Sequence, residues 1–218
     1  LQSRPNLDAE RRAHFVSVIV KESERLTRLI NQVLELAKLE SGLAEWHPGE
    51  IDLGGLIEDA AASTAALFRE RGVRLRLRLP EGVPRLRSDG DRVTQVLWNL
   101  LSNAAKFSPA ETGEVTVTLN VLPEALQVDV ADNGGGIDPA HHREIFERFR
   151  QIGDTLTYKP QGSGLGLSIS REIIQRLGGR LWVESALGRG ATFSFTLPRV
   201  AAPRFARPAA RDAGVMPE

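Results

Sequence analysis

Cysteine is absent from this sequence of 218 residues, which excludes disulfide bonds, thiol nucleophiles and cysteine-bound zinc. An excess of either charge is also missing, because 28 lysine and arginine residues balance 28 aspartate and glutamate residues. A neutral chain has no global attraction for nucleic acid, so we predict no nucleic-acid partner. No apolar run reaches the roughly 20 residues that cross a bilayer, and no signal peptide is visible at Leu1. We therefore expect a cytoplasmic chain that reaches a membrane only through an anchor upstream of Leu1.

Glycine, by contrast, is concentrated in two turns that bracket a polar segment. The turns read Asp132-Asn133-Gly134-Gly135-Gly136-Ile137 and Gly162-Ser163-Gly164-Leu165-Gly166-Leu167. Glycine lets main-chain N–H groups approach a ligand closely, and the second turn runs into a helical pattern whose first N–H groups and dipole favour an anion. One such turn is a weak signal, but two of them, the first led by an acid, indicate a nucleotide held at both ends.

The two commonest nucleotide-binding loops do not fit this pattern. The dinucleotide-binding fold requires a strand immediately before its glycines, whereas residues 158–161 intervene before Gly162. A Walker-type loop requires Gly-Lys followed by Ser or Thr, and the sequence contains no such tripeptide. The phosphates are therefore expected to meet a different arrangement of glycines.

Residues 8–40 are predicted to form one long helix, because apolar residues recur there at spacings of three and four. Asp8 is the expected N-cap, and Gly42 is the expected stop. So broad an apolar stripe needs a partner surface. We expect a bundle or coiled-coil dimerisation helix whose hairpin mate lies outside this segment, and the alternative is a helix packed on its own domain.

The rest of the chain alternates between helical and strand patterns, which predicts an α+β fold. Residues 41–55 are rich in glycine and are expected to be a linker. Helices are predicted over 56–70, 91–107, 138–149 and after Gly162, and strands over 73–79, 114–121, 125–131, 180–185 and 191–197. The segment 150–161 has no periodicity and is expected to be a lid, and residues 199–218 a flexible tail.

The predicted helix 91–107 carries amide and ammonium groups beside its apolar stripe. Asn99 and Asn103 lie one turn apart on one face, and asparagine is a modest helix former, so their placement suggests a task. Asn103 offers a neutral oxygen to a magnesium ion that phosphate oxygens already share. Lys106 can reach a phosphate, and Phe107 offers an aromatic face to a base. Asn103 and Lys106 are therefore the candidate catalytic residues.

The first glycine turn is suited to a purine base. Asp132 follows a predicted strand, and its carboxylate can accept a hydrogen bond from an amine such as the N6 group of adenine. Gly134 and Gly136 keep the wall thin enough for a flat ring. At the second turn, Gly164 and Gly166 offer N–H groups to the phosphates.

Five motifs together resemble the ordered boxes of sensor histidine kinases. They are residues 99–108, 132–137, 146–149, 162–167 and 188–193. The resemblance covers roughly residues 8–198 and implies a Bergerat-type α/β sandwich, a mixed sheet with helices on one face, that binds ATP and Mg²⁺. It implies a nucleotide site made of Asn99, Asn103, Lys106, Phe107, Asp132, Gly134, Gly136, Ile137, Gly162, Ser163, Gly164, Leu165, Gly166, Leu167 and Thr192, with Asn103 on the metal.

The same resemblance divides the chain. Residues 1–42 resemble the second helix of a dimerisation and histidine-phosphotransfer hairpin, 43–55 a linker, 56–198 the ATP-binding catalytic domain and 199–218 a tail. The implied activity is transfer of the γ-phosphoryl of ATP to a histidine, for relay to an aspartate on a response-regulator receiver domain. The implied assembly is a homodimer through the N-terminal helix.

Two features depart from the family pattern. The phosphoacceptor box is absent, because none of the four histidines, His14, His47, His141 and His142, lies in a His-Glu context that ends in proline. The acceptor is therefore expected upstream of Leu1. Gln151 stands where many relatives place an arginine that touches phosphate, and Arg148 or Arg150 is the available substitute.

Two other classes share these nucleotide boxes. Chaperone, mismatch-repair and topoisomerase ATPases resemble the chain there, but they usually place a water-activating glutamate where Asn99 stands, and an amide is no general base. The other alternative is a nucleotide-binding regulatory module without turnover, against which the intact Asn103, Lys106 and Asp132 argue.

Overall fold

The computed structural model describes residues 9–150 and 163–199. Its helices are α1 (Ala9–Glu40), α2 (Leu53–Glu70), α3 (Gly90–Phe107) and α4 (Gly166–Arg176), with short 3-10 turns η1 (Pro139–His141) and η2 (Glu144–Phe146). Its strands are β1 (Gly49–Ile51), β2 (Arg74–Arg78), β3 (Leu86–Ser88), β4 (Glu114–Val121), β5 (Ala125–Asp132), β6 (Leu181–Ser185) and β7 (Ala191–Pro198). Within the described ranges, no helix combines the length and hydropathy needed to cross a membrane.

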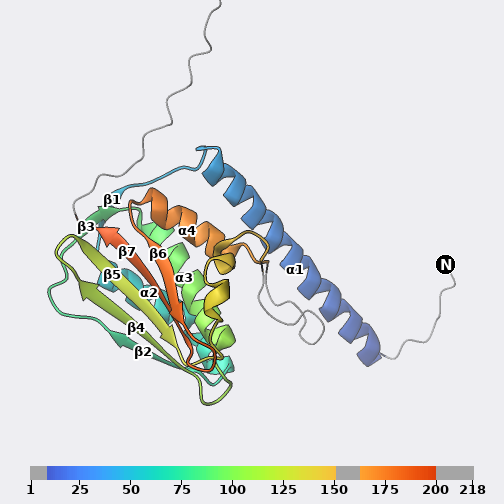
Figure 1. The fold of residues 1–218 in the computed structure, drawn as a ribbon. Coiled ribbons are helices and arrows are strands. Elements are labelled where there is room, and N and C mark those ends of the chain that lie inside the picture. Colours follow the sequence, from blue (N-terminus) through green and yellow to red (C-terminus); the bar gives the residue numbers. More distant parts are fainter. Residues whose placement is uncertain (1–8, 151–162, 200–218) are drawn as a thin grey trace, which may run out of the picture.

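The domain has two layers, a five-stranded sheet and the helices α2, α3 and α4 on one of its faces (Figure 1). The strand order is β2-β4-β5-β7-β6, with β2 parallel to β4 and every other pair antiparallel. The predicted α+β sandwich, with a mixed sheet and helices on one face, is confirmed.

Strand alternation and helical periodicity build the core between these layers. On β5, Leu126, Val128 and Val130 are buried, while the residues between them face the open side of the sheet. The buried stripe of α3 packs against this face, and burying each large aliphatic side chain contributes about 1.5–3 kcal/mol. Asp89 caps α3 by accepting a hydrogen bond from the Arg92 N–H at 3.1 Å, so the helix begins at Gly90, one residue before the predicted start.

Two sequence-based predictions of local structure are wrong. The expected linker 43–55 contains strand β1, which pairs antiparallel with β3, and α2 already starts at Leu53 behind the N-cap Asp52. The expected helix 138–149 is replaced by η1 and η2. Asp138 does cap η1, but the backbone is extended at Glu147, and Phe146 is buried with its ring edge-on to Phe193.

Helix α1 is docked against the described part of the domain at its C-terminal end and extends away from the sheet (Figure 1). Near its C-terminus Leu36 and Leu39 are buried, and Glu35 accepts hydrogen bonds from Arg92 and from Gln95 of α3. Gly42 ends the helix with φ +71°, as predicted. Among the described residues, the packing of α1 on its own domain therefore involves its last turns. The predicted N-cap Asp8, most of the predicted lid and the tail beyond Arg199 lie outside the described residues.

Candidate nucleotide-binding site

The polar face of α3 lies along one side of the candidate site. Asn99, Asn103 and Lys106 are all half-buried, and they border the stripe that packs on the sheet. Helix α3 contacts both β5 and α4, so this face lies between the two glycine turns. The structure therefore brings the expected α3 residues toward both turns.

Asp132 ends β5 on the same face as Val128 and Val130, directed toward the helices. Its carboxylate accepts hydrogen bonds from the backbone N–H of Gly134, at 2.8 Å, and of Ala191. Burial raises the pKa of Asp132 above its ordinary value, and the two backbone hydrogen bonds partly oppose that rise. The two hydrogen bonds do not fully replace the solvation that this carboxylate loses on burial. It is therefore suited to accept a further N–H group.

The turn after Asp132 is packed too closely for side chains. A Cβ on Gly134 would lie 2.4 Å from the Phe107 carbonyl oxygen, so this glycine brings the turn against the end of α3. Gly136 has φ +71°, and its Cβ would lie 2.0 Å from the Ala186 carbonyl oxygen. The Ile137 N–H is used internally, because it donates to Ser185 Oγ at 2.8 Å.

The second glycine turn leads into α4 without a side-chain cap. Gly164 has φ +72°, and its carbonyl oxygen accepts from the Phe149 N–H at 3.0 Å. Ser163 Oγ accepts from the N–H of Leu165, which is buried and precedes α4. Within residues 9–150 and 163–199 no side chain caps α4, so its first-turn N–H groups are suited to an anion. Gly162 lies outside the described residues, and Leu167 packs partly on the core.

Lys106 lies at the C-terminal end of α3 beside a second cation. Its ammonium is 4.4 Å from the centroid of the Phe107 ring, which is exposed. Arg71, at the end of α2, donates from Nη1 to the Lys106 carbonyl oxygen at 3.2 Å. Burial and, to a lesser extent, the Arg71 charge lower the pKa of Lys106. A phosphate beside the ammonium would favour its charged form and so offset the effects of burial and of the Arg71 charge.

The structure does not bring Thr192 to the site. Along β7, Ala191 and Phe193 are buried toward the helices, so Thr192 faces the open side, in register with Ala131. Ala191, which the sequence reasoning missed, pairs with Asp132 and donates its N–H to the carboxylate. The strand alternation that placed Asp132 would have identified Ala191 once the pairing of β5 with β7 was known.

The two possible replacements for the missing arginine are paired elsewhere. Arg148 forms an ion pair with Glu40 of α1. The guanidinium of Arg150 lies 3.4 Å from the Glu147 carboxylate. Both arginines are exposed, and Gln151 lies outside the described residues.

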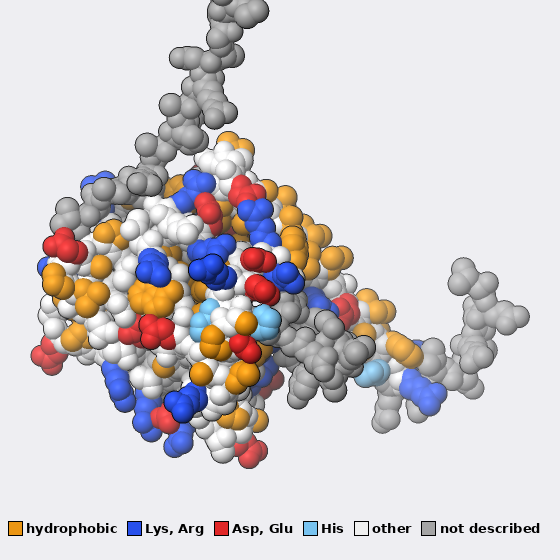
Figure 2. Space-filling model, viewed as in Figure 1, with side chains coloured by type: hydrophobic (Ala, Val, Ile, Leu, Met, Phe, Trp, Pro, Cys, Tyr) orange, Lys and Arg blue, Asp and Glu red, His pale blue; other side chains and the backbone are white. Residues whose placement is uncertain are grey.

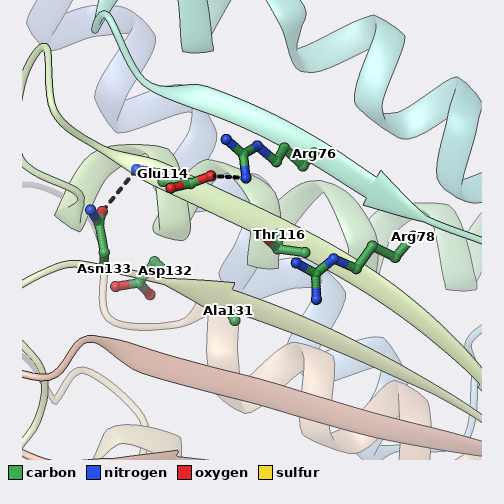
Figure 3. Close-up of a pocket in the computed structure, with 7 residues that line it drawn as sticks. All are labelled: Arg76, Arg78, Glu114, Thr116, Ala131, Asp132 and Asn133. Carbon is green, nitrogen blue, oxygen red and sulfur yellow. Dashed lines mark hydrogen bonds and ion pairs between the residues drawn. The ribbon is translucent and has the colours of Figure 1, made fainter.

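A hollow on the open face of the sheet shares Asp132 with this site (Figure 3). Its lining is Arg76, Arg78, Glu114, Thr116, Ala131, Asp132 and Asn133. Asn133 accepts from the Glu114 N–H at 2.8 Å, and Arg76 pairs with the Glu114 carboxylate at 2.7 Å. Asn103, Lys106 and the N-terminus of α4 all lie on the opposite, helix side of the sheet. The hydrogen bond from Glu114 to Asn133 ties the start of the Asp132 turn to β4.

The donors at this site fit a magnesium ion that arrives with phosphates. The described residues contain no cluster of three acidic or histidine side chains that would make a protein-only metal site. Magnesium commonly keeps waters and phosphate oxygens and takes only one or two protein oxygens. The half-buried Asn103 amide is a suitable single ligand of that kind.

Comparison with known proteins agrees with this geometry. Residues 88–201 match the family model described as histidine kinase-, DNA gyrase B-, and HSP90-like ATPase. Sensor histidine kinase WalK of Bacillus subtilis is 37% identical over 189 residues, which is 84% of this chain and 30% of WalK. Sensor histidine kinase AruS of Pseudomonas aeruginosa is 38% identical over 198 residues, which is 86% of this chain and 19% of AruS. The chain thus spans about a third or less of these relatives.

Two solved structures show similar folds. Full-length ShkA in complex with AMPPNP aligns with a TM-score of 0.76 and 31% identity, over 91% of this chain and 41% of ShkA. Histidine kinase ThkA in complex with the response regulator protein TrrA aligns with a TM-score of 0.73 and 25% identity, over 90% of this chain and 54% of ThkA. Both alignments extend well beyond the part of the chain matched by the family model.

Proposed function

Because this chain belongs to the family of histidine kinase-, DNA gyrase B- and HSP90-like ATPases, and its relatives are sensor histidine kinases, we propose that it is the ATP-binding part of a protein-histidine kinase. It transfers the γ-phosphoryl of ATP to a histidine on a dimerisation domain. The observation that carries this proposal is the meeting of Asp132, the Asn103 and Lys106 face of α3 and the uncapped N-terminus of α4 on one side of the sheet.

Each of these groups has a role in holding the nucleotide. The Asp132 carboxylate accepts the adenine N6 amine, and the exposed Phe107 ring flanks the base. Lys106 and the first N–H groups of α4 receive the phosphates. Asn103 supplies one oxygen to Mg²⁺, which when bound neutralises charge on the phosphate oxygens.

The transfer itself needs positioning more than covalent chemistry from this domain. An imidazole nitrogen attacks the γ-phosphorus in line, the bond to the bridging oxygen breaks, and ADP leaves. The imidazole proton passes to a base beside the acceptor histidine. Lys106 and the α4 N–H groups stabilise the charge that moves onto the phosphate oxygens, an effect worth about 3–4 kcal/mol for a well-placed donor in a dry site.

Hydrolysis is the weaker proposal. The position that a water-activating base would occupy holds Asn99, whose amide nitrogen donates to Ser170 Oγ at 2.9 Å. An amide cannot take a proton from water at neutral pH. A protein nucleophile therefore suits this site better than water.

The proposal extends to partners. Helix α1 is the second helix of a dimerisation and phosphotransfer hairpin, and the protein is a homodimer through it. The phosphoryl group then passes to an aspartate on a receiver domain. The relative ThkA was solved with a response regulator protein, which supports this class of partner.

Autophosphorylation of a longer chain that carries the acceptor histidine tests the proposal. Asn103→Ala should reduce Mg-dependent labelling from γ-labelled ATP at least 100-fold, because the metal loses its protein ligand. Asn120→Ala is the matched control, since Asn120 bonds Asp129 on the open face of the sheet. Unchanged labelling in the Asn103 variant would refute the metal role. Release of free phosphate without labelled histidine would refute the kinase.

A further inference from the structure

Helices α3 and α4 are joined by a hydrogen bond between two side chains. Asn99 Nδ2 donates to Ser170 Oγ at 2.9 Å. Ser170 is only 2% exposed, so its hydroxyl cannot turn to bulk water for a replacement partner. A hydrogen bond to a buried group is costly to lose, because the remaining partner stays desolvated.

The oxygen end of the same amide lies against the first residue of α4. A Cβ on Gly166 would lie 2.3 Å from Asn99 Oδ1 and 3.0 Å from its Cγ. A side chain at this position would meet the Asn99 amide, so Gly166 leaves the room that the amide occupies. Both ends of the Asn99 amide therefore contact α4, one at Gly166 and the other at Ser170, which is four residues or about one turn later.

This contact sets the distance between two parts of the phosphate site. The first N–H groups of α4 have no side-chain cap from the part of the chain that the structure describes. Asn103 lies one turn beyond Asn99 on α3, on the same face. Moving α4 away from Asn99 would therefore move its N–H groups away from the Asn103 oxygen and the Lys106 ammonium.

We propose that Asn99 and Ser170 are a positioning pair, which fixes the N-terminus of α4 beside Asn103, and that Asn99 is not itself a ligand of nucleotide or metal. The proposal rests on ATP binding at this site. An amide suits the role because it can donate to the serine while remaining neutral. A carboxylate in its place would put a negative charge beside the triphosphate.

A double-mutant cycle on the full chain separates positioning from direct contact. The affinity of AMPPNP is measured by calorimetry for the wild type, Asn99→Ala, Ser170→Ala and the double variant, with magnesium and with EDTA. We expect each single variant to weaken binding about five-fold, which corresponds to one hydrogen bond. The double variant should be no more than two-fold weaker than either, and the losses should be equal with and without magnesium.

Direct contact predicts a different result. If Asn99 binds the nucleotide or its metal, Ser170→Ala will leave affinity unchanged and Asn99→Ala will act alone, with a loss that depends on magnesium. Either observation overturns the proposal. Ser168→Ala is the matched control, because Ser168 is also buried on α4 but donates within its own helix, to the Leu165 carbonyl oxygen at 2.9 Å. It should change affinity less than two-fold.

A second measurement covers the case in which a variant is poorly folded. In the wild type, the Asn99 side-chain amide should give a proton resonance protected from exchange, and saturating Mg-AMPPNP should leave it protected. Loss of protection on nucleotide binding would mean that the amide leaves Ser170, and would refute the pair. Failure of the wild type to bind AMPPNP at all would instead refute the proposed function.

Discussion

Asp132 and Lys106 are half-buried groups of opposite charge type, and burial moves their pKa values in opposite directions. Burial raises the pKa of Asp132 and lowers that of Lys106, because in each case the charged form loses solvation. Perturbed groups gather at functional sites, and these two lie at the ends proposed for the base and the phosphates. An amine on the carboxylate and a phosphate on the ammonium would both favour the charged forms.

Asp132→Asn should weaken ATP binding at least ten-fold while leaving the fold at least as stable. The folded pKa of Asp132 lies above its unfolded value, so ionisation opposes folding at neutral pH, and this penalty disappears as pH falls through the folded pKa. The amide keeps the oxygen that accepts from Gly134 and removes the buried charge. Calorimetry with ATP and with a purine analogue lacking the N6 amine, beside thermal melts at pH 7, measures both effects. Equal losses for the two nucleotides would contradict the adenine assignment.

The pH profile of ATP affinity should have an alkaline limb, a fall in affinity at high pH, that is due to Lys106. Its pKa is lowered, so the ammonium loses its proton at a lower pH than an ordinary lysine, and affinity should fall as pH rises through that value. Lys106→Arg should flatten the limb, because a guanidinium stays charged. Arg71→Met should move the limb to higher pH, because it removes the neighbouring charge that lowers the pKa of Lys106. Titrations of ATP between pH 7 and 10.5 measure this. A limb that Lys106→Arg leaves in place would belong to another group.

At the scale of elements, the turn between β6 and β7 supports the Asp132 turn. Gly188 donates its N–H to the Gly135 carbonyl oxygen at 2.8 Å, and Ser185 Oγ donates to the Gly190 carbonyl oxygen at 2.6 Å. Gly190 lies so close that its Cβ would be 1.9 Å from the Asp132 carbonyl oxygen. The geometry of the Asp132 turn thus depends on a hairpin more than 50 residues later in the chain.

Two glycines of this hairpin make a matched pair of substitutions. Gly190 and Gly188 have φ +72° and +74°, so alanine is strained by about 1–2 kcal/mol at either position. Only Gly190→Ala adds a clash, since nothing lies within 4 Å of a Cβ on Gly188. We expect Gly190→Ala to lower the melting temperature clearly more than Gly188→Ala, and to weaken ATP binding. Equal effects in thermal melts and titrations would show that the clash does not govern the turn.

Periodicity in the sequence predicted the elements whose partners are continuous faces. The apolar stripe of α3 and the alternation of β4 and β5 can be recognised from neighbouring residues alone. These patterns therefore predicted the elements that hold Asn103, Lys106 and Asp132. Strand β1 was not predicted, because its three residues are defined by pairing with β3, more than 30 residues away. The same reason hid the contact of Asn99 with Ser170 and the side of the sheet on which Thr192 lies.

At the scale of the whole molecule, α1 has two different surfaces. Its last turns are held to the rest of the fold through Glu35, Leu36 and Leu39. The remainder projects past α4 with apolar side chains in solvent, visible along its flank in Figure 2. These include Phe15, Ile19, Leu26, Ile30 and Val33, which are 39% to 64% exposed. Large apolar patches on soluble proteins mark interaction sites, and a helix with this spacing suits a helical partner.

In the proposed homodimer, Ile19→Glu combined with Leu26→Glu should therefore shift the chain toward monomer. Each buried aliphatic side chain contributes about 1.5–3 kcal/mol to such an interface, and a buried unpaired carboxylate costs more than that contribution. Sedimentation velocity at several concentrations measures the assembly. Leu187→Glu is the control, because Leu187 is 65% exposed in the turn between β6 and β7, and its charge should leave association unchanged. A wild-type chain that stays monomeric at about 100 μM, or a double variant that still dimerises, would show that this face of α1 does not hold two copies together. Circular dichroism should remain helical in the variant, because both positions are already in solvent in the single chain and the C-terminal turns keep their contacts with α3.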